Sequence, residues 1–285
     1  MGGIVTEMFR LLLIKLFYYT GMAFISRKVL ANKGKFILMF HGVSMEKIKG
    51  IDSSIQPHLS KDEFESILCW LKKNFDFLHP RDLSNSEKSG LLITFDDGFH
   101  NNYSNVLPLL NKYEIPGLFF VSTQHIENPK NWMHFIKSKI EKNCSLLNLN
   151  EDVQSDLFDG ISKEDLAMMA SNQFVTIGSH TISHPLLSKC SKEEINKELI
   201  NSKKYLEKIS GQSVDYFSYP SGDYDIRVLK IIGESGYKNA FGIDKINNLG
   251  QSKFEIPRIG IYSHKKPYLA AKLSGLYVRP LNLSF

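Results

Sequence analysis

Short apolar segments alternate with amphipathic segments along most of the chain. The apolar segments are four or five residues long and rich in β-branched and aromatic side chains. They predict buried strands at residues 36–40, 91–95, 118–121, 174–177, 216–219 and 240–243. Apolar residues at helical spacing predict helices at residues 61–74, 101–113, 132–142, 192–209 and 225–235. This alternation favours an α/β fold with a largely parallel sheet, either open or closed into a barrel.

Two of the predicted helices carry end signals. Ser191 and Glu194 have the spacing of a capping box at the start of the fourth helix. Gly236 stands where a glycine cap would end the fifth. In parallel α/β folds the chemistry collects at the carboxyl ends of the strands, so the residues that follow each strand are the candidates for a site.

The first 34 residues differ in composition from the rest. They predict an N-terminal amphipathic helix at residues 1–34, followed by a single domain at residues 35–285. Residues 1–35 hold six basic side chains and one acid, which accounts for the whole net charge of +5. The remaining 250 residues are neutral in sum, so composition gives no support for nucleic-acid binding.

The apolar run at residues 8–25 is interrupted by Lys15 and falls short of the ~20 residues that a membrane-spanning helix needs. Arg27 and Lys28 follow the run, whereas a cleaved signal peptide has its basic residues before it. We therefore expect an interfacial helix on an anionic membrane surface, and a cytoplasmic protein that is peripheral at the inner face of the cell membrane. The alternatives are a helix packed on its own domain and a signal anchor that places the domain outside the cytoplasm.

The three cysteines, Cys69, Cys144 and Cys190, are an odd number without paired spacing. This pattern argues against a disulfide framework or a cysteine zinc site and favours a reducing compartment. No internal repeat or linker rich in proline and glycine divides residues 35–285, and the polar stretch at residues 143–160 is interpreted as an insertion within one domain.

Two consecutive carboxylates end the second predicted strand. Asp96 and Asp97 follow residues 91–95, and Gly98 comes next. Adjacent acids repel each other unless a cation or a function compensates. Successive strand residues point to opposite sides, but a turn at Gly98 can bring both carboxylates to one site. A solvated Asp-Asp-Gly turn is the alternative interpretation.

Two histidines follow the fourth predicted strand. His180 and His184 lie on one face if the chain makes a helical turn there, a spacing suited to chelating one metal ion. Together with a strand-end carboxylate they would form a site of two histidines and one carboxylate. Such a site leaves coordination positions open for water and substrate.

These two motifs resemble those of the NodB-like polysaccharide deacetylases, the fourth family of carbohydrate esterases. Thr-Phe-Asp-Asp-Gly at residues 94–98 and His-Thr-Ile-Ser-His-Pro at residues 180–185 are similar to the first two motifs of that family. Further similarity extends from about residue 36 to residue 262. The resemblance implies a distorted (β/α) barrel of the seven-stranded type that binds a divalent metal.

By the same resemblance, Asp97, His180 and His184 are the metal ligands and Asp96 is the catalytic base. The expected metal is Zn²⁺, with Co²⁺, Ni²⁺ and Mn²⁺ as alternatives. Such an ion lowers the pKa of a bound water, which then attacks the amide carbonyl while the base takes its proton.

The third family motif departs from the usual pattern. Members commonly carry an arginine that pairs with the base two residues before a proline, but here that residue is Ser218. Arg258 resembles the arginine that replaces it in a subset of the family, and it is expected to pair with Asp96.

Tyr219, Pro220 and Ser221 are the residues expected at the substrate and oxyanion site. The backbone N–H of Ser221 would serve the oxyanion. Family members usually carry an aromatic residue at that position, so one aromatic wall of the sugar site is missing.

His41 ends the first predicted strand. This resembles the permuted exopolysaccharide deacetylases, whose acid histidine comes first in the chain, so His41 is the expected general acid. The later candidate, His264, lies in a polar stretch. The other histidines have no chelating partner at helical or strand spacing: they are His58, His79, His100, His125 and His134.

The sequence therefore predicts a metal-dependent N-deacetylase of cell-surface polysaccharide metabolism, acting on an N-acetylated polysaccharide or a lipid-linked glycan. One alternative is a hydrolase of another C–N bond, or of an O-acyl bond, on the same scaffold. The other is an inactive glycan-binding module. Asp96 argues against that module, because binding alone does not need a base.

Overall fold

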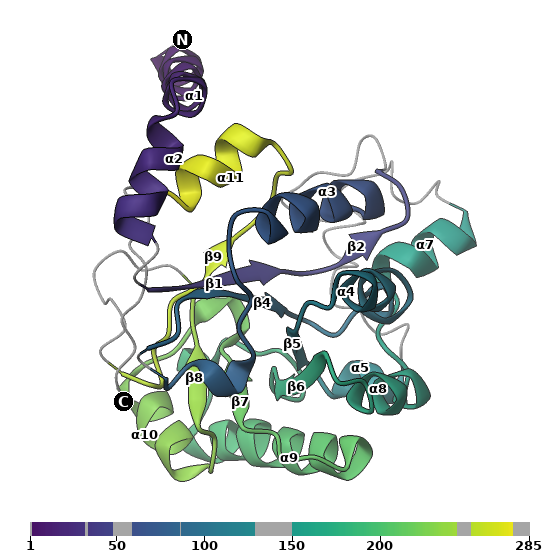
Figure 1. Ribbon diagram of the computed structural model, residues 1–285. Helices are drawn as coiled ribbons and strands as arrows, with labels where there is room; N and C mark the ends of the chain where they lie inside the picture. The colour runs from purple at the N-terminus through teal and green to yellow at the C-terminus, as the bar shows by residue number, and fades with distance from the viewer. Residues whose placement is uncertain are drawn as a thin grey trace.

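The computed structural model describes residues 2–31, 34–47, 59–85, 87–128, 150–243 and 252–275. In these ranges seven parallel strands form one sheet in the order β8-β7-β6-β5-β4-β1-β9, with helices around its outside (Figure 1). The strands are β1 (Lys35–Phe40), β4 (Gly90–Phe95), β5 (Gly117–Val121), β6 (Val175–Ser179), β7 (Tyr216–Ser218), β8 (Asn239–Phe241) and β9 (Ile259–Gly260). The short strands β2 (Val43–Ser44) and β3 (Leu59–Ser60) pair separately.

The sheet curls so that its two edges are joined. At one edge β9, the last strand, pairs with β1, the first. At the other edge Ile256, three residues before β9, bridges to Phe241 of β8. The stretch from Ile256 to Ile259 thus runs from one edge of the sheet to the other. This confirms the distorted barrel that the resemblance implied.

Side chains alternate between the two faces of each strand. One face contributes to a small cluster that includes Ile37, Leu92 and Phe120 together with Ile256 of the closing segment. The other face, which carries Phe36 and its neighbours in register, belongs to the large core beneath the helices. All six residues of β1 and of β4 are buried, as expected for parallel strands covered on both sides.

The α-helices of the domain within the described ranges are α3 (Lys61–Lys72), α4 (Leu107–Tyr113), α5 (Gln124–Glu127), α7 (Glu151–Phe158), α8 (Lys163–Ala170), α9 (Lys192–Ser210), α10 (Ile226–Glu234) and α11 (Lys266–Lys272). The predicted capping box is present at the start of α9, and Gly236 adopts a left-handed φ of 76° just beyond α10. The predicted insertion at residues 143–160 contains α7. The helix predicted at residues 132–142 lies outside the described residues.

The helix predicted at residues 101–113 is a π-helical turn, Asn102–Val106, followed by α4. Pro108 lies in the first turn of α4. Because proline has no N–H to donate, it cannot make the backbone hydrogen bond that would continue one uninterrupted α-helix through this point. The regular helix therefore starts later than the apolar pattern predicts.

The N-terminal segment is two helices and not one. α1 (Gly2–Tyr19) ends at Tyr19, and the left-handed φ of 77° at Gly21 turns the chain into α2 (Met22–Ser26) and a π-helical turn at Arg27–Ala31. Ala23 and Arg27 are buried against the domain. α1 contacts α11 and lies at the edge of the molecule (Figure 1). The segment is thus packed onto residues 35–275, at least through α2.

Candidate active site

A tight turn separates the two carboxylates at the end of β4. Asp97 and Gly98 both adopt left-handed conformations, with φ values of 81° and 80°. A Cβ atom on Gly98 would lie 2.7 Å from the Val121 side chain, so only glycine fits there. The turn lets Asp96 face the interior of the curled sheet while Asp97 faces the histidines, as the sequence suggested for Gly98.

An irregular loop carries the two histidines after β6. Thr181 and His184 have positive φ values of 70° and 56°, so the chain does not make the helical turn considered from the i, i+4 spacing. Left-handed conformations of residues other than glycine cost roughly 1–3 kcal/mol each and persist where the surroundings impose them. Five residues other than glycine have a positive φ in the described ranges, and three of them, Asp97, Thr181 and His184, lie in the β4 turn or in this histidine loop.

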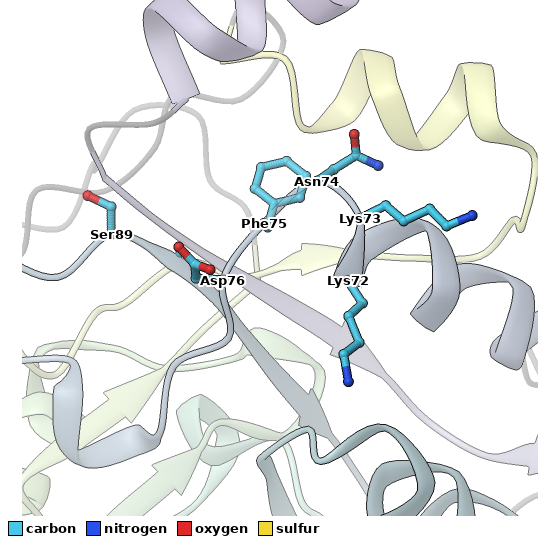
Figure 2. Close-up of a pocket in the computed structure, with 7 residues that line it drawn as sticks. Lys72, Lys73, Asn74, Phe75, Asp76 and Ser89 are labelled. Carbon is cyan, nitrogen blue, oxygen red and sulfur yellow. The ribbon is translucent and has the colours of Figure 1, made fainter.

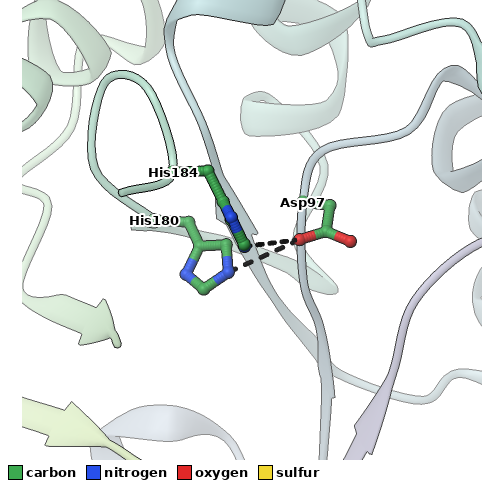
Figure 3. Close-up of side chains that lie close together, drawn as sticks. All are labelled: Asp97, His180 and His184. Carbon is green, nitrogen blue, oxygen red and sulfur yellow. Dashed lines mark ion pairs between the residues drawn. The ribbon is translucent and has the colours of Figure 1, made fainter. Parts of the chain in front are cut away.

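Asp97, His180 and His184 come together at the carboxyl edge of the sheet (Figure 3). The Nε2 atoms of both histidines lie 3.5 Å from Asp97 Oδ1. Three donors that bind one zinc ion tetrahedrally, each at about 2.0–2.1 Å, are separated by roughly 3.3 Å from one another. The spacing and the chemistry of these donors therefore fit a divalent metal ion with open coordination positions.

A neighbouring hydrogen bond orients His180 for such a role. Its Nδ1 lies 2.8 Å from the carbonyl oxygen of Ser218, which can only accept, so Nδ1 carries the proton. Nε2 is then the nitrogen that faces Asp97, and it would bind a metal ion once it gives up its proton. Metal-binding histidines are commonly oriented in this way through their second nitrogen.

The pKa values of the three candidate ligands shift in different directions. Burial would raise the pKa of Asp97, but the hydrogen bond from His180 and the attraction of His41 and His184 hold it well below its usual range. Burial lowers the pKa of His180, yet Asp96 and Asp97 outweigh this and raise it. Burial, together with repulsion by His180, lowers the pKa of His184 to about 4. An ionised Asp97 next to a His184 ring that burial keeps neutral offers the carboxylate oxygen and the nitrogen lone pair that a metal cation needs.

The histidine loop is held from α9 by Glu198, which the sequence analysis missed. Its Oε2 accepts hydrogen bonds from the N–H groups of Ile182 (2.7 Å) and Ser183 (3.0 Å), and its Oε1 accepts one from Ser183 Oγ at 2.7 Å. No local sequence signal links α9 to this loop, because the contact depends on how the helix packs against β6.

We expect Glu198→Ala to lower the affinity for metal by about 10- to 100-fold, the usual effect of losing a group that orients metal ligands. Without the carboxylate, the loop has no partner for its two N–H groups and relaxes from its left-handed conformation. Zn²⁺ affinity is measured by competition with a chelating dye. Glu193→Ala, an exposed change on the same helix, is the control and should retain wild-type affinity. Equal affinities in all three proteins would show that the loop needs no such support.

Asp96 forms a buried ion pair with Arg258. The Nη1 and Nη2 atoms of Arg258 donate to Oδ1 and Oδ2 of Asp96, both at 2.6 Å. Arg258 is fully buried, and it also donates to Ser218 Oγ (2.7 Å) and Thr94 Oγ1 (3.1 Å). Arg258 thus lies where the resemblance placed it, and Ser218 leaves room for its guanidinium. Its role in turnover stays a prediction.

Arg258→Ala should move the acid limb of the pH–rate profile to higher pH. Burial alone would raise the pKa of Asp96, but Arg258 and His180 outweigh it and keep the pKa below its usual value. Removing the guanidinium raises the pKa of Asp96. On acidification Asp96 is then protonated, and activity falls, at a higher pH than in the wild-type protein. The profile of kcat/KM against pH measures the shift. Arg227→Ala, a change at an exposed arginine, is the control. If the acid limb stays at the wild-type pH and turnover is normal, Arg258 has only a structural role.

His41 follows β1 at the same edge of the sheet. Its carbonyl oxygen accepts a hydrogen bond from Asn102 Nδ2 at 3.0 Å, which fixes the exit of the strand. The ring attracts both Asp96 and Asp97 electrostatically, and its Nδ1 is buried without a hydrogen-bond partner among the described residues. His264, by contrast, lies 3.0 Å from Glu63 Oε1 at the start of α3.

Of the three residues predicted to bind the substrate and the oxyanion, two are buried and one is exposed. The Tyr219 side chain is fully buried and donates to the carbonyl oxygen of Phe254 at 2.9 Å, so it does not face a substrate. The side chain packs under the turn, and the place of Tyr219 at the substrate site stays a prediction. Pro220 is buried as well. Ser221 is exposed with a left-handed φ of 54°, and its N–H stays the predicted oxyanion donor.

His125, at α5, belongs to the surroundings of the cluster although its sequence spacing gave no hint of it. The ring is buried, and burial lowers its pKa to about 4 against the attraction of Asp97. Backbone hydrogen bonds from Thr123 to Thr181 and from Gln124 to Ile182 join its loop to the histidine loop. A neutral histidine therefore borders the candidate metal site.

Two surface hollows lie at the amino ends of the strands, at the other end of the sheet from the candidate metal site. One, of about 400 Å³, is lined by Lys72, Asp76 and Gly90, among others (Figure 2). The other, of about 610 Å³, is bordered by Val175 and Tyr216. Gly90, Val175 and Tyr216 begin their strands, whereas the metal-ligand candidates follow strand ends. Neither hollow adjoins the cluster.

Comparisons with known proteins identify relatives of this chain. The family model described as "Polysaccharide deacetylase" matches residues 84–240. The Bacillus subtilis (strain 168) protein YxkH is 28% identical over 211 residues, which are 71% of this chain and 62% of YxkH, so the chain spans less than two thirds of that relative. The poly-beta-1,6-N-acetyl-D-glucosamine N-deacetylase of Staphylococcus aureus (strain N315) is 28% identical over 235 residues, 77% of this chain and 73% of the relative.

Solved structures share the fold. The deacetylase PplD from Streptococcus pyogenes, in complex with acetate, superposes with a TM-score of 0.63 and 23% identity over 85% of this chain and 98% of PplD. IcaB from Ammonifex degensii gives a TM-score of 0.63 and 21% identity over 85% of this chain and 97% of IcaB. At these identities the likeness establishes the fold and nothing further.

Proposed function

The chain belongs to the polysaccharide deacetylase family, and we propose that it is a metal-dependent N-deacetylase that releases acetate from N-acetylated sugar residues of a polysaccharide. One observation carries the proposal. Two histidines and a carboxylate converge at 3.5 Å spacing beside a second carboxylate, Asp96, whose charge is fixed by Arg258. A binding module has no use for the second carboxylate.

A divalent ion held by Asp97, His180 and His184 would polarise the acyl carbonyl and make a water molecule nucleophilic near neutral pH. Asp96 is the proposed base that takes the proton from the attacking water. Its bidentate pairing with Arg258 uses only part of its acceptor capacity, because an ionised carboxylate offers about four lone-pair sites. The lowered pKa keeps it ionised, and therefore able to accept a proton, down to acidic pH.

The departing amine needs a proton, and His41 is the proposed donor. An imidazole can carry a proton and release it to a leaving amine, which is the role of a general acid. His41 follows β1 as Asp96 follows β4, and the last residues of these adjacent strands, Phe40 and Phe95, are paired in register. The N–H of Ser221 is the proposed donor to the developing oxyanion.

The proposed substrate is an N-acetylated polysaccharide, with β-1,6-linked N-acetylglucosamine as the first to test. The names of the Staphylococcus aureus relatives support this choice. A lipid-linked glycan that carries the same sugar presents the same bond.

Replacing His41 by alanine should lower turnover by about 10² to 10⁴ while metal content and folding stay normal, because an acid is lost and no ligand is removed. His264→Ala should be nearly silent, since that ring pairs with Glu63. If the two results were reversed, the acid would come late in the chain and β1 would not supply it.

The proposed function is tested on β-1,6- and β-1,4-linked N-acetylglucosamine oligomers and on an O-acetylated sugar. Released acetate and new primary amines are measured in the same sample. The proposal expects one amine for each acetate from at least one N-acetylated oligomer. Acetate from the O-acetylated sugar alone, without new amines, would identify an esterase.

A further inference from the structure

An unusually apolar surface covers the N-terminal helices. Ten of the sixteen large apolar side chains that are exposed in the described residues lie between residues 9 and 29. They are Phe9, Leu11, Leu12, Leu13, Leu16, Tyr19, Met22, Phe24, Ile25 and Val29. A helix that is apolar around most of its circumference is normally covered, either by protein or by lipid.

The domain holds this surface in place through α2. Ala23 is buried, and Ser26 Oγ donates to the carbonyl oxygen of Ser274 at 2.8 Å. The Arg27 guanidinium lies over the rings of Trp70 (5.9 Å) and Phe75 (5.5 Å). α1 contacts α11. The two helices, bent by 73° at their junction, therefore form a fixed elbow on the domain.

The elbow carries positive charge and no negative charge. Lys15 and Lys28 are exposed among the apolar side chains. The sequence contains no Asp or Glu from residue 8 to residue 45. Apolar side chains mixed with lysines, without acids, are complementary to a surface that has an apolar layer beneath anionic groups. Anionic lipid headgroups over acyl chains have this arrangement.

The elbow is too short to cross a bilayer as one helix. No single described helix is long and apolar enough to span a membrane. Among the described residues, only the bent pair Phe9–Tyr19 and Met22–Val29 reaches the required length and hydropathy, and it does so only when its two helices are taken together. α1 has 18 residues, so it is about 27 Å long at 1.5 Å per residue, and Arg10 and Lys15 interrupt it. A hydrocarbon core of ~30 Å would leave both charges buried.

We propose that the α1–α2 elbow, residues 9–29, docks on the interface of an anionic bilayer, with its apolar side chains among the acyl chains and its lysines at the headgroups. This binding does not depend on the deacetylase activity. Removing residues 1–31 would uncover Trp70 and Phe75, so the test uses point variants of the full chain.

The test is cosedimentation with vesicles of phosphatidylglycerol and phosphatidylcholine (1:1) and of phosphatidylcholine alone. Wild-type protein should bind the anionic vesicles at least tenfold more tightly, and 1 M NaCl should weaken that binding. Lys15→Gln/Lys28→Gln should weaken it about 30-fold, from roughly fivefold for each lysine. Its control, Lys197→Gln/Lys204→Gln on α9, makes the same charge change elsewhere and should bind as wild type.

Leu12→Glu/Leu16→Glu should reduce binding by roughly 100-fold or more, because two carboxylates replace two leucines that would enter the acyl region. Met168→Glu/Ile226→Glu is the matched control, since these side chains are as exposed as the leucines but lie outside the elbow. It should bind normally. All four variants should keep wild-type activity on a short soluble substrate.

Three outcomes would overturn the proposal. Equal binding by wild type and the Leu12→Glu/Leu16→Glu variant would show that the elbow does not enter lipid. Protein that stays with the vesicles after a sodium carbonate wash would be spanning the bilayer. A solution dimer that the leucine variant dissociates, without any lipid binding, would make a second copy of the chain the partner.

Discussion

Replacing both His180 and His184 by alanine is expected to give a folded protein that binds no metal and has no measurable deacetylase activity. The two rings supply two of the three candidate ligands, each with its Nε2 3.5 Å from Asp97 Oδ1, and the single carboxylate that remains cannot hold a divalent ion against water. The acyl carbonyl then has no Lewis acid and the nucleophile has an unperturbed pKa. Metal content of the purified protein and acetate release together measure the effect.

The control for this double variant is His100→Ala/His264→Ala, which also removes two imidazoles. Both rings are partly exposed and pair with acids elsewhere, His100 with Asp165 and His264 with Glu63. This protein should keep a full complement of metal and most of its activity. Stoichiometric metal in the His180→Ala/His184→Ala protein would refute the ligand assignment, whatever its activity.

Asp96→Asn is expected to lower turnover by about 10³ or more while leaving the metal bound. The amide has nearly the shape of the carboxylate but cannot take a proton from the attacking water. The substitution also leaves the buried Arg258 without its counter-charge, so the melting temperature should fall, because one partner of a buried ion pair has been neutralised. Metal analysis, single-turnover kinetics and thermal unfolding separate these effects.

Asp82→Asn is the matched control for that variant. Asp82 accepts hydrogen bonds from the backbone of His79 and from Lys88, and it lies near the amino end of the sheet. Its loss should affect stability modestly and turnover little. Loss of the metal from Asp96→Asn would mean that this carboxylate is a ligand, and near-normal turnover would mean that another group is the base.

Much of the fold, and the central residues of the candidate site, could be predicted from local sequence patterns. Buried parallel strands are short apolar runs because both of their faces are covered, so all six predicted strands of the main sheet are present. β9 has only two residues, which is too short for a periodic signal. Asp96 and Asp97 stood out because like charges at the end of an apolar strand need compensation, and the structure supplies Arg258 for the first.

Other features of the site depend on contacts between distant segments. Glu198 and His125 reach the histidine loop through the packing of α9 and α5, and neither has a local pattern that points there. Tyr219 sits in a motif typical of substrate contact, yet its side chain turns into the core. The break in the N-terminal helix depends on Gly21 and on the fit of Arg27 against Trp70. Periodicity along one segment cannot reveal such partners.

The central claim, a metal-dependent N-deacetylase at Asp97, His180 and His184, is tested most directly by titrating metal-free protein with Zn²⁺ while acetate release from N-acetylglucosamine oligomers is measured. Activity should be absent before the first addition, rise in proportion to bound metal and level off at one equivalent per chain. Acetate release by the metal-free protein at the same rate, unaffected by added Zn²⁺, would contradict the account.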